Sequence, residues 1–305
     1  IVTLVALIGT LPYIALQLKA IVYSYQQLQE SHDLVPGQIG LVVSLVLAGF
    51  TMLFGIRSID VTERHPGVML AIAFESLIKI IAFLAVGIFV TFFVFNSPGE
   101  LWQASKANVK LNEQLQLPNL ASMTGMLIIV MAAFLSLPRQ FQVMVVELRN
   151  PKDTKLSRRI FPLYLLVFAI FAAPLGLAGH LILGDSVPAD AYVLFLPSHH
   201  GQEWLTMFAF LGAVSAASSM VIISSIALST MLSNEIVFPL LFKNPKDQSE
   251  DFDEFRLRLL SIRKILVLCV ILMGYGVFLA APADKLASLG QVAFGAIAQI
   301  TPALI

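Results

Sequence analysis

Long apolar runs separated by short polar connectors make up most of the chain. A helix needs about 20 consecutive apolar residues to cross the ~30 Å hydrocarbon core of a bilayer, and the runs reach that length instead of forming the narrow stripe of a half-buried helix. The pattern predicts eight membrane-spanning helices, at 1–26, 37–56, 67–96, 119–145, 160–183, 206–242, 265–281 and 289–305. The predicted fold class is therefore all-α, a polytopic membrane helix bundle.

Composition and charge exclude several other classes of protein. Of the 305 residues, 58% are hydrophobic and 12% are charged, against ~45–50% and ~25% in typical globular chains. The 19 Lys and Arg residues balance the 19 Asp and Glu residues, so no basic surface is available to neutralise nucleic-acid phosphates. The single cysteine, Cys269, has no partner for an internal disulfide. We expect the lipid bilayer as a partner and no nucleic acid.

Lys and Arg residues are unevenly distributed among the seven connectors. The second, fourth and sixth connectors hold 2, 5 and 6 of them, whereas the other four hold 0, 2, 0 and 1. Cytoplasmic loops carry the excess of basic residues in membrane proteins. The alternation therefore predicts that both ends of the chain lie on the cytoplasmic side. Because Ile1 and Ile305 lie inside apolar runs, we expect the chain to be a piece of a longer protein.

Glu75 and Lys79 lie four residues apart within the third predicted span. That spacing places both side chains on one helix face, within reach of each other. One interpretation is a buried ion pair that neutralises itself and holds the helix against its neighbours. The other is a charge relay or switch that opens during a conformational change. The sequence leaves both open.

The fourth predicted span contains the segment Ser136-Leu137-Pro138-Arg139, where the proline predicts a kink or an unwound turn because it lacks an N–H group. Backbone groups freed inside a membrane persist only where protein or a watery cavity receives them, which makes the break a candidate site for an ion or a polar solute. Arg139 and Gln142 carry donors suited to a carboxylate. The candidate solute-binding residues are Ser136, Pro138, Arg139 and Gln142. The alternative is a simple kink with Arg139 reaching the cytoplasmic interface.

The sixth predicted span carries a run of small residues that includes Ser215, Ser218 and Ser219. Such residues allow helices to pack closely without any ligand. Their hydroxyl oxygens are also ligands that a hard cation such as sodium accepts. Either role is open. No paired carboxylates, nucleophile with a nearby histidine or phosphate-binding glycine loop occurs in the spans, so no catalytic residue and no metal beyond sodium is predicted.

Three segments, in order, resemble the sodium/solute symporter family: 54–58 with 62–63, then 134–147 with the basic residues after it, then 212–235. The chain resembles still more closely the symporter-like membrane domain of bacterial sensor histidine kinases. The segments that carry this second resemblance are 11–19, 74–79, 137–141, 226–229 with 233–235, and 294–302.

The resemblance implies a single domain, 1–305, that is part of an inverted-repeat symporter-like fold with five helices per repeat. Residues 1–96 would be the last three helices of the first repeat, and 119–305 the whole second repeat. A sodium ion would be bound by Ser218 and Ser219, or by Ser215 in a shifted alignment, with Glu63 as the acidic group near the ion. In another alignment the hydroxyl positions fall on Ala216 and Ala217.

The function implied by the resemblance is detection of a small polar nutrient such as an amino acid, in the bacterial inner membrane. Occupancy would pass to a kinase domain further along the same chain and then to a response regulator. Whether the solute also crosses the membrane is left open. The alternative is an ordinary sodium-coupled solute symporter.

Overall fold

The computed structural model is an all-α bundle, and its described residues are 2–28, 35–56, 64–109, 111, 119–148, 150–241, 252–281, 286–299 and 301. Its helices and helical turns are α1 Val2–Leu28, α2 Pro36–Phe54, α3 Pro66–Ile88, η1 Phe89–Val94, α4 Pro98–Ala107, α6 Leu120–Ser136, α7 Pro138–Phe141, η2 Gln142–Val146, α8 Pro151–Ile182, η3 Gly184–Ser186, η4 Ala189–Ala191, α9 Tyr192–His199, α10 Glu203–Leu232, η5 Ser233–Val237, α11 Phe238–Leu241, α12 Phe252–Ala280 and α13 Leu286–Ala298.

Proline and small polar residues set where many of these helices begin. Proline is favoured in the first turn because the N–H group that it lacks would have no helical partner there. It occupies that turn in α2, α3, α4, α7 and α8. Side-chain oxygens of Ser97, Asn119 and Asn150 accept hydrogen bonds from the first turns of α4, α6 and α8, which satisfies backbone donors that the helices leave free.

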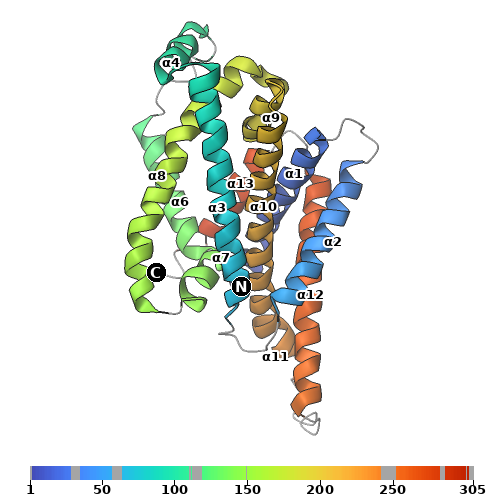
Figure 1. Ribbon diagram of the computed structural model, residues 1–305. Helices are drawn as coiled ribbons and strands as arrows, with labels where there is room; N and C mark the ends of the chain where they lie inside the picture. The colour runs from blue at the N-terminus through green and yellow to red at the C-terminus, as the bar shows by residue number, and fades with distance from the viewer. Residues whose placement is uncertain are drawn as a thin grey trace.

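α1 occupies the middle of the bundle (Figure 1), where it packs against α13, α10, α12 and α2. The buried apolar residues of this part form one cluster, which includes Ile14, Leu18 and Ile271. A second cluster joins α3, α4, α8 and α9, with Val86 and Leu196 fully buried. α10 packs against both α1 and α3. It therefore connects the two clusters and places its small-residue face beside α3.

The described residues contain six or seven candidate spans, where the sequence predicts eight. Six helices of the described residues are long and apolar enough to cross a membrane, and a seventh span results if α6 and the α7–η2 segment, bent by 55°, are taken together. The eighth predicted span, 289–305, begins in α13, and because residues 300 and 302–305 lie outside the described residues, a crossing there stays a prediction. Apolar character predicts burial but does not show where a helix ends. The last turn of α13 closes with a hydrogen bond from the N–H group of Gln299 to the carbonyl oxygen of Ala296, three residues earlier.

Several predicted connectors are partly helical. α8 begins at Pro151 and α12 at Phe252, well before the predicted starts of their spans at 160 and 265. The first turns of α8 are polar and exposed, and they include Lys152 and Arg158. Hydropathy marks where a helix enters lipid, whereas caps and prolines mark where it starts. These two helices therefore extend beyond the apolar region.

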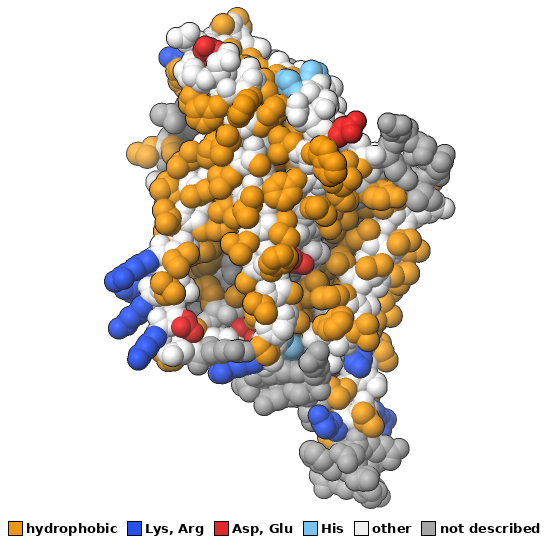
Figure 2. Space-filling model, viewed as in Figure 1, with side chains coloured by type: hydrophobic (Ala, Val, Ile, Leu, Met, Phe, Trp, Pro, Cys, Tyr) orange, Lys and Arg blue, Asp and Glu red, His pale blue; other side chains and the backbone are white. Residues whose placement is uncertain are grey.

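Basic side chains gather at one end of the bundle, where α3, α8 and α12 begin (Figure 2), and we call this the basic end. The face shown between the two ends is largely apolar. Exposed apolar residues are numerous on α6 and α8, where Leu127, Ile128 and Leu163 are each exposed by at least 60%. Such a belt is what a bilayer covers, and the chain is therefore a multi-pass membrane protein.

Two buried basic side chains attach α12 to its neighbours. Near the C-terminus of α12, Nζ of Lys19 on α1 donates a hydrogen bond of 2.8 Å to the carbonyl oxygen of Ala281. At the basic end, Arg263 on α12 donates from Nη2 to Oδ1 of Asn234 and from Nε to Oγ of Ser233 in η5. A cation at the C-terminus of a helix also interacts favourably with the helix dipole. These contacts hold α12 against α1 and η5.

A close approach of α12 to α1 gives a test of this packing. A Cβ atom at Gly274 would overlap Cγ2 of Ile14 and lie 3.0 Å from its Cβ, and the branched Ile14 side chain has little rotamer freedom to move aside. We expect Gly274→Ala to lower the free energy of unfolding by about 1–3 kcal/mol relative to Gly276→Ala. Gly276 lies on the same helix, and a Cβ there meets nothing within 4 Å. Thermal unfolding midpoints of the purified chain check this, and equal midpoints would contradict the contact.

Candidate functional site

The predicted break in the fourth span is present. α6 ends at Ser136, Leu137 has extended backbone angles (φ −66°, ψ 119°), and α7 begins at Pro138. The two helical parts are bent by 55°. Because Pro138 has no N–H group, the carbonyl group of Phe134 has no donor one turn later. The kink that the sequence predicted is confirmed.

The hydroxyl groups of Ser136 and Thr301 meet at this break. Oγ of Ser136 lies 2.7 Å from Oγ1 of Thr301. The Thr301 hydroxyl group donates to the carbonyl oxygen of Ala132 at 3.0 Å, so it accepts the hydrogen bond from Ser136. Both side chains are buried. The chain just after α13 is therefore attached by hydrogen bonds to the end of α6, two segments that are 165 residues apart in sequence.

Arg139 is the second residue of α7, and its side chain packs against α1 instead of extending only to the bundle surface. Its guanidinium carbon lies 3.8 Å from the ring centroid of Tyr13 on α1, and that ring also lies beside Phe294 on α13, with centroids 6.3 Å apart. Nη1 of Arg139 is buried and has no hydrogen-bond partner. One turn before Tyr13, the buried hydroxyl group of Thr10 also has none. The geometry leaves an incompletely paired cation between α1, α7 and α13.

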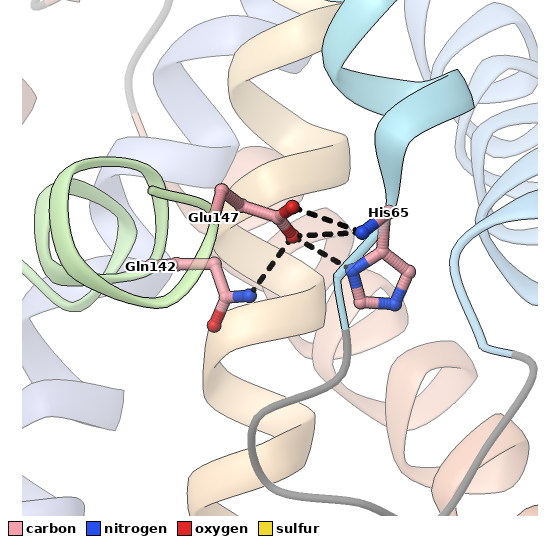
Figure 3. Close-up of polar contacts among 3 residues, drawn as sticks. All are labelled: His65, Gln142 and Glu147. Carbon is pink, nitrogen blue, oxygen red and sulfur yellow. Dashed lines mark hydrogen bonds and ion pairs between the residues drawn. The ribbon is translucent and has the colours of Figure 1, made fainter. Parts of the chain in front are cut away.

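Gln142 lies in a different polar cluster from Arg139 (Figure 3). Its Nε2 donates to Oε1 of Glu147 at 3.3 Å. The same carboxylate accepts two hydrogen bonds from the backbone N–H of His65, at 2.9 and 3.2 Å, and Oε1 lies 2.8 Å from the Nδ1 of the His65 ring. The side chains of His65 and Glu147 are only 6% and 4% exposed. The structure thus forms a buried polar cluster at the start of α3, which the sequence analysis did not identify.

Glu75 and the serine run face each other across α3 and α10. The hydroxyl groups of Ser218 and Ser219 lie near the Glu75 carboxyl group. They donate to carbonyl groups of their own helix, Ser219 to Ser215 at 2.9 Å and Ser218 to Ser215 at 3.3 Å. The buried Oε2 of Glu75 accepts no hydrogen bond. The structure therefore brings two of the predicted ion ligands, Ser218 and Ser219, near the carboxyl group of Glu75, for which the sequence predicts a different role.

Lys79 lies one turn after Glu75 on α3. The two side chains attract each other electrostatically, but these two described residues have no direct ion-pair contact. Both are partly buried. Glu63, the remaining predicted ion ligand, lies outside the described residues, so its place relative to Ser218 and Ser219 stays a prediction.

Four residues of these sites that the sequence does not predict, His65, Glu147, Tyr13 and Thr301, have only weak signals in the sequence. His65 and Glu147 lie in the second and fourth connectors, which the Lys and Arg alternation places on one side of the membrane. Titratable residues that border spans on one side are candidates for pairing across helices. Tyr13 and Thr301 each adjoin a proline within an apolar run, where a break needs polar partners. None of these signals specifies which pairs form.

The partly buried charges on α3 yield a test. We expect Lys79→Ala to destabilise the chain more than the double change Glu75→Gln/Lys79→Gln, because the single change leaves one charge without its counterion. An isolated charge inside a membrane costs at least ~2.5 kcal/mol on insertion scales. Thermal midpoints and the folded yield in membranes are the measurements. If the double variant is the less stable one, the two side chains do not compensate each other.

No protein-family model, no curated protein and no solved structure matches the chain. Its sequence and structure establish a polytopic helical membrane protein with six or seven candidate spans.

Proposed function

We propose that this chain is the membrane domain of a symporter-like sensor histidine kinase. It binds a small polar nutrient such as an amino acid between its helices, and its occupancy controls a kinase domain in the same chain and, through it, a response regulator. Transport of the solute accompanies binding if the bundle alternates its exposure to the two sides. The observation that carries the solute site is the buried, unpartnered Nη1 of Arg139 at the helix break.

A guanidinium group in this position favours binding of an anion. A charged side chain inside a membrane costs at least ~2.5 kcal/mol unless it is paired or hydrated. The face of Tyr13 offsets part of that through a cation–π contact, but it accepts none of the in-plane N–H groups. Within the described part of the chain, Arg139 has no carboxylate partner. A solute carboxylate, which can accept two parallel hydrogen bonds from a guanidinium group, completes the arrangement.

The helix break suits a solute that carries a hydrogen-bond donor for its oxygen atoms. The carbonyl group of Phe134 lacks its helical donor because residue 138 is proline, and the hydroxyl groups of Ser136 and Thr301 meet at the same end of α6. An amino acid carries an ammonium group that donates to such oxygens and a carboxylate that pairs with Arg139. This combination favours an amino acid over a simple sugar as the solute.

The proposal includes an orientation and a repeat organisation. The basic end lies in the cytoplasm of a bacterial cell, because basic loops translocate poorly. Residues 1–96 are the last three helices of a first repeat and 119–305 the second repeat. The broken α6–α7 segment is then the first helix of the second repeat. Half-helices that end near the midplane are the usual solute-binding elements of inverted-repeat transporters.

The role of Arg139 is tested by direct binding. The full-length protein in lipid nanodiscs is assayed with a panel of radiolabelled amino acids and short carboxylates. We expect Arg139→Gln to weaken binding of the amino acid that the unmodified protein binds by about 10–100-fold, because a hydrogen bond between charged groups contributes ~1.5–3 kcal/mol. Arg159→Gln removes an exposed basic residue of α8 and should change binding little. Equal affinities for all three proteins would remove Arg139 from the site.

A second candidate function is an ordinary sodium-coupled solute symporter, and one contact favours it. The Glu75 carboxyl group, with a buried oxygen that accepts no hydrogen bond, faces the hydroxyl groups of Ser218 and Ser219. Oxygen ligands of this kind suit a hard cation. In this version Ser215, Ser218 and Ser219, with Glu63 or Glu75, bind sodium, and the ion gradient drives accumulation of the solute.

Uptake separates the two functions. Full-length protein in vesicles is given the labelled amino acid with and without an inward sodium gradient. For a symporter we expect sodium-stimulated accumulation that falls by about tenfold in Ser219→Ala, because one hard-cation ligand is lost. Ser229→Ala is the control, since that buried hydroxyl group of the same helix donates to the Ile226 carbonyl. Binding without accumulation under either condition supports the sensor alone.

A further inference from the structure

The polar cluster of His65, Gln142 and Glu147 links the end of η2 to the start of α3, two segments that lie far apart in the sequence. Glu147 directly follows η2, and His65 directly precedes α3. The Glu147 carboxylate receives hydrogen bonds from the His65 backbone and from Gln142, and it contacts the His65 ring at 2.8 Å. All three side chains are buried (Figure 3). A buried carboxylate is stable only when donors compensate its lost hydration, so the cluster must form or break as a unit.

The carboxylate also lies at the N-terminus of α3. His65 is the residue that precedes the first turn, and Pro66 contributes no N–H group there. A negative charge at a helix N-terminus is favoured by the helix dipole and by the free backbone donors. Glu147 therefore interacts with the end of a long helix as well as with one side chain. It attaches the α7–η2 segment, which we call the arm, to α3.

Besides these polar contacts, the arm packs against α10, and its Arg139 contacts the ring of Tyr13. Phe141, Val143, Met144 and Val145 are exposed by 39–58%, so most of its apolar surface faces outward, and only Gln142 among its η2 residues is buried. At its other end the arm is joined to α6 through the extended Leu137, at a bend of 55°. An element that is joined at a bend at one end and attached by polar contacts at the other can rotate about the bend when those contacts break.

We propose that His65 and Glu147 form a latch that holds the arm against α3 and closes the basic end of the bundle below Arg139. Release of the latch lets the arm swing about Leu137 and opens the Arg139 region to water at the basic end. Water that enters at the basic end can then hydrate the separated imidazole and carboxylate groups. The latch acts in the same way whichever solute Arg139 binds, because it is formed by His65 and Glu147 and does not involve the solute.

The latch is tested by the sidedness of cysteine labelling. In a Cys269→Ser background, which removes the exposed native thiol, Thr10→Cys introduces a reporter beside Tyr13. Thr10 is 3% exposed and its hydroxyl group has no hydrogen-bond partner, so the replacement disturbs little. The full-length protein is labelled with a membrane-impermeant thiol reagent in right-side-out and in inverted membrane vesicles. The rates from the two sides report which end is open.

We expect Glu147→Gln to raise the labelling rate from the basic end by about tenfold and to lower the rate from the opposite end, because a lost hydrogen bond to a charged group shifts the population toward the open form. Arg64→Ala is the matched control: it removes an exposed charge adjacent to His65 and should leave both rates unchanged. In Glu147→His, Ni²⁺ can bridge two imidazole groups, and its addition should restore slow labelling from the basic end.

Two results would overturn the latch. One is labelling that Glu147→Gln and Ni²⁺ leave unchanged from both sides. The other is an equal rise from both sides, which indicates a general loosening of the bundle. Rescue by Ni²⁺ separates a folded, open protein from a misfolded one. Neither result depends on solute binding, so failure of the latch and failure of the Arg139 site are distinguishable.

Discussion

Water is absent from the hydrocarbon core of a bilayer, and every backbone polar group inside it must therefore find a partner in the protein. This constraint explains why the break at Pro138 organises the surrounding structure. A proline in a soluble surface helix exposes a carbonyl group to solvent, whereas here the break lies in an apolar span. The hydroxyl groups of Ser136 and Thr301 gather beside it. The chain after α13 is thereby held at the same level as the end of α6.

The same constraint applies to charge, and the structure meets it in different ways. His65 and Glu147 pair directly and are nearly inaccessible. Lys19 binds the carbonyl group of Ala281 just after α12. Arg139 is only partly compensated, by an aromatic face. A fully compensated charge contributes to structure, and an incompletely compensated one favours binding of a counterion. This difference is why we assign the solute to Arg139 and the latch to His65 and Glu147.

The arm connects the proposed solute site at Arg139 with the proposed latch of His65 and Glu147. Arg139 lies near its pivot and Glu147 at its far end, with η2 between them. Small shifts of a bistable element move whatever is attached to it. A solute that binds Arg139 differently in the two arm positions therefore biases the latch, and by linkage the latch biases the solute affinity. The contacts of α10 with α1, α3 and α7 provide the surface against which the arm moves.

The sequence by itself determined that the chain is helical, membrane-spanning and broken at Pro138, because long apolar runs and proline act locally, through hydrophobicity and the backbone. It predicted eight spans, of which the described residues contain six or seven candidates. It identified Glu75, Ser218 and Ser219 but not that they face one another. Only the tertiary structure decided which polar groups meet. Gln142, for example, contacts Glu147 and does not share a cluster with Arg139. Pairing between distant helices depends on how the helices rotate and pack, which no local pattern encodes.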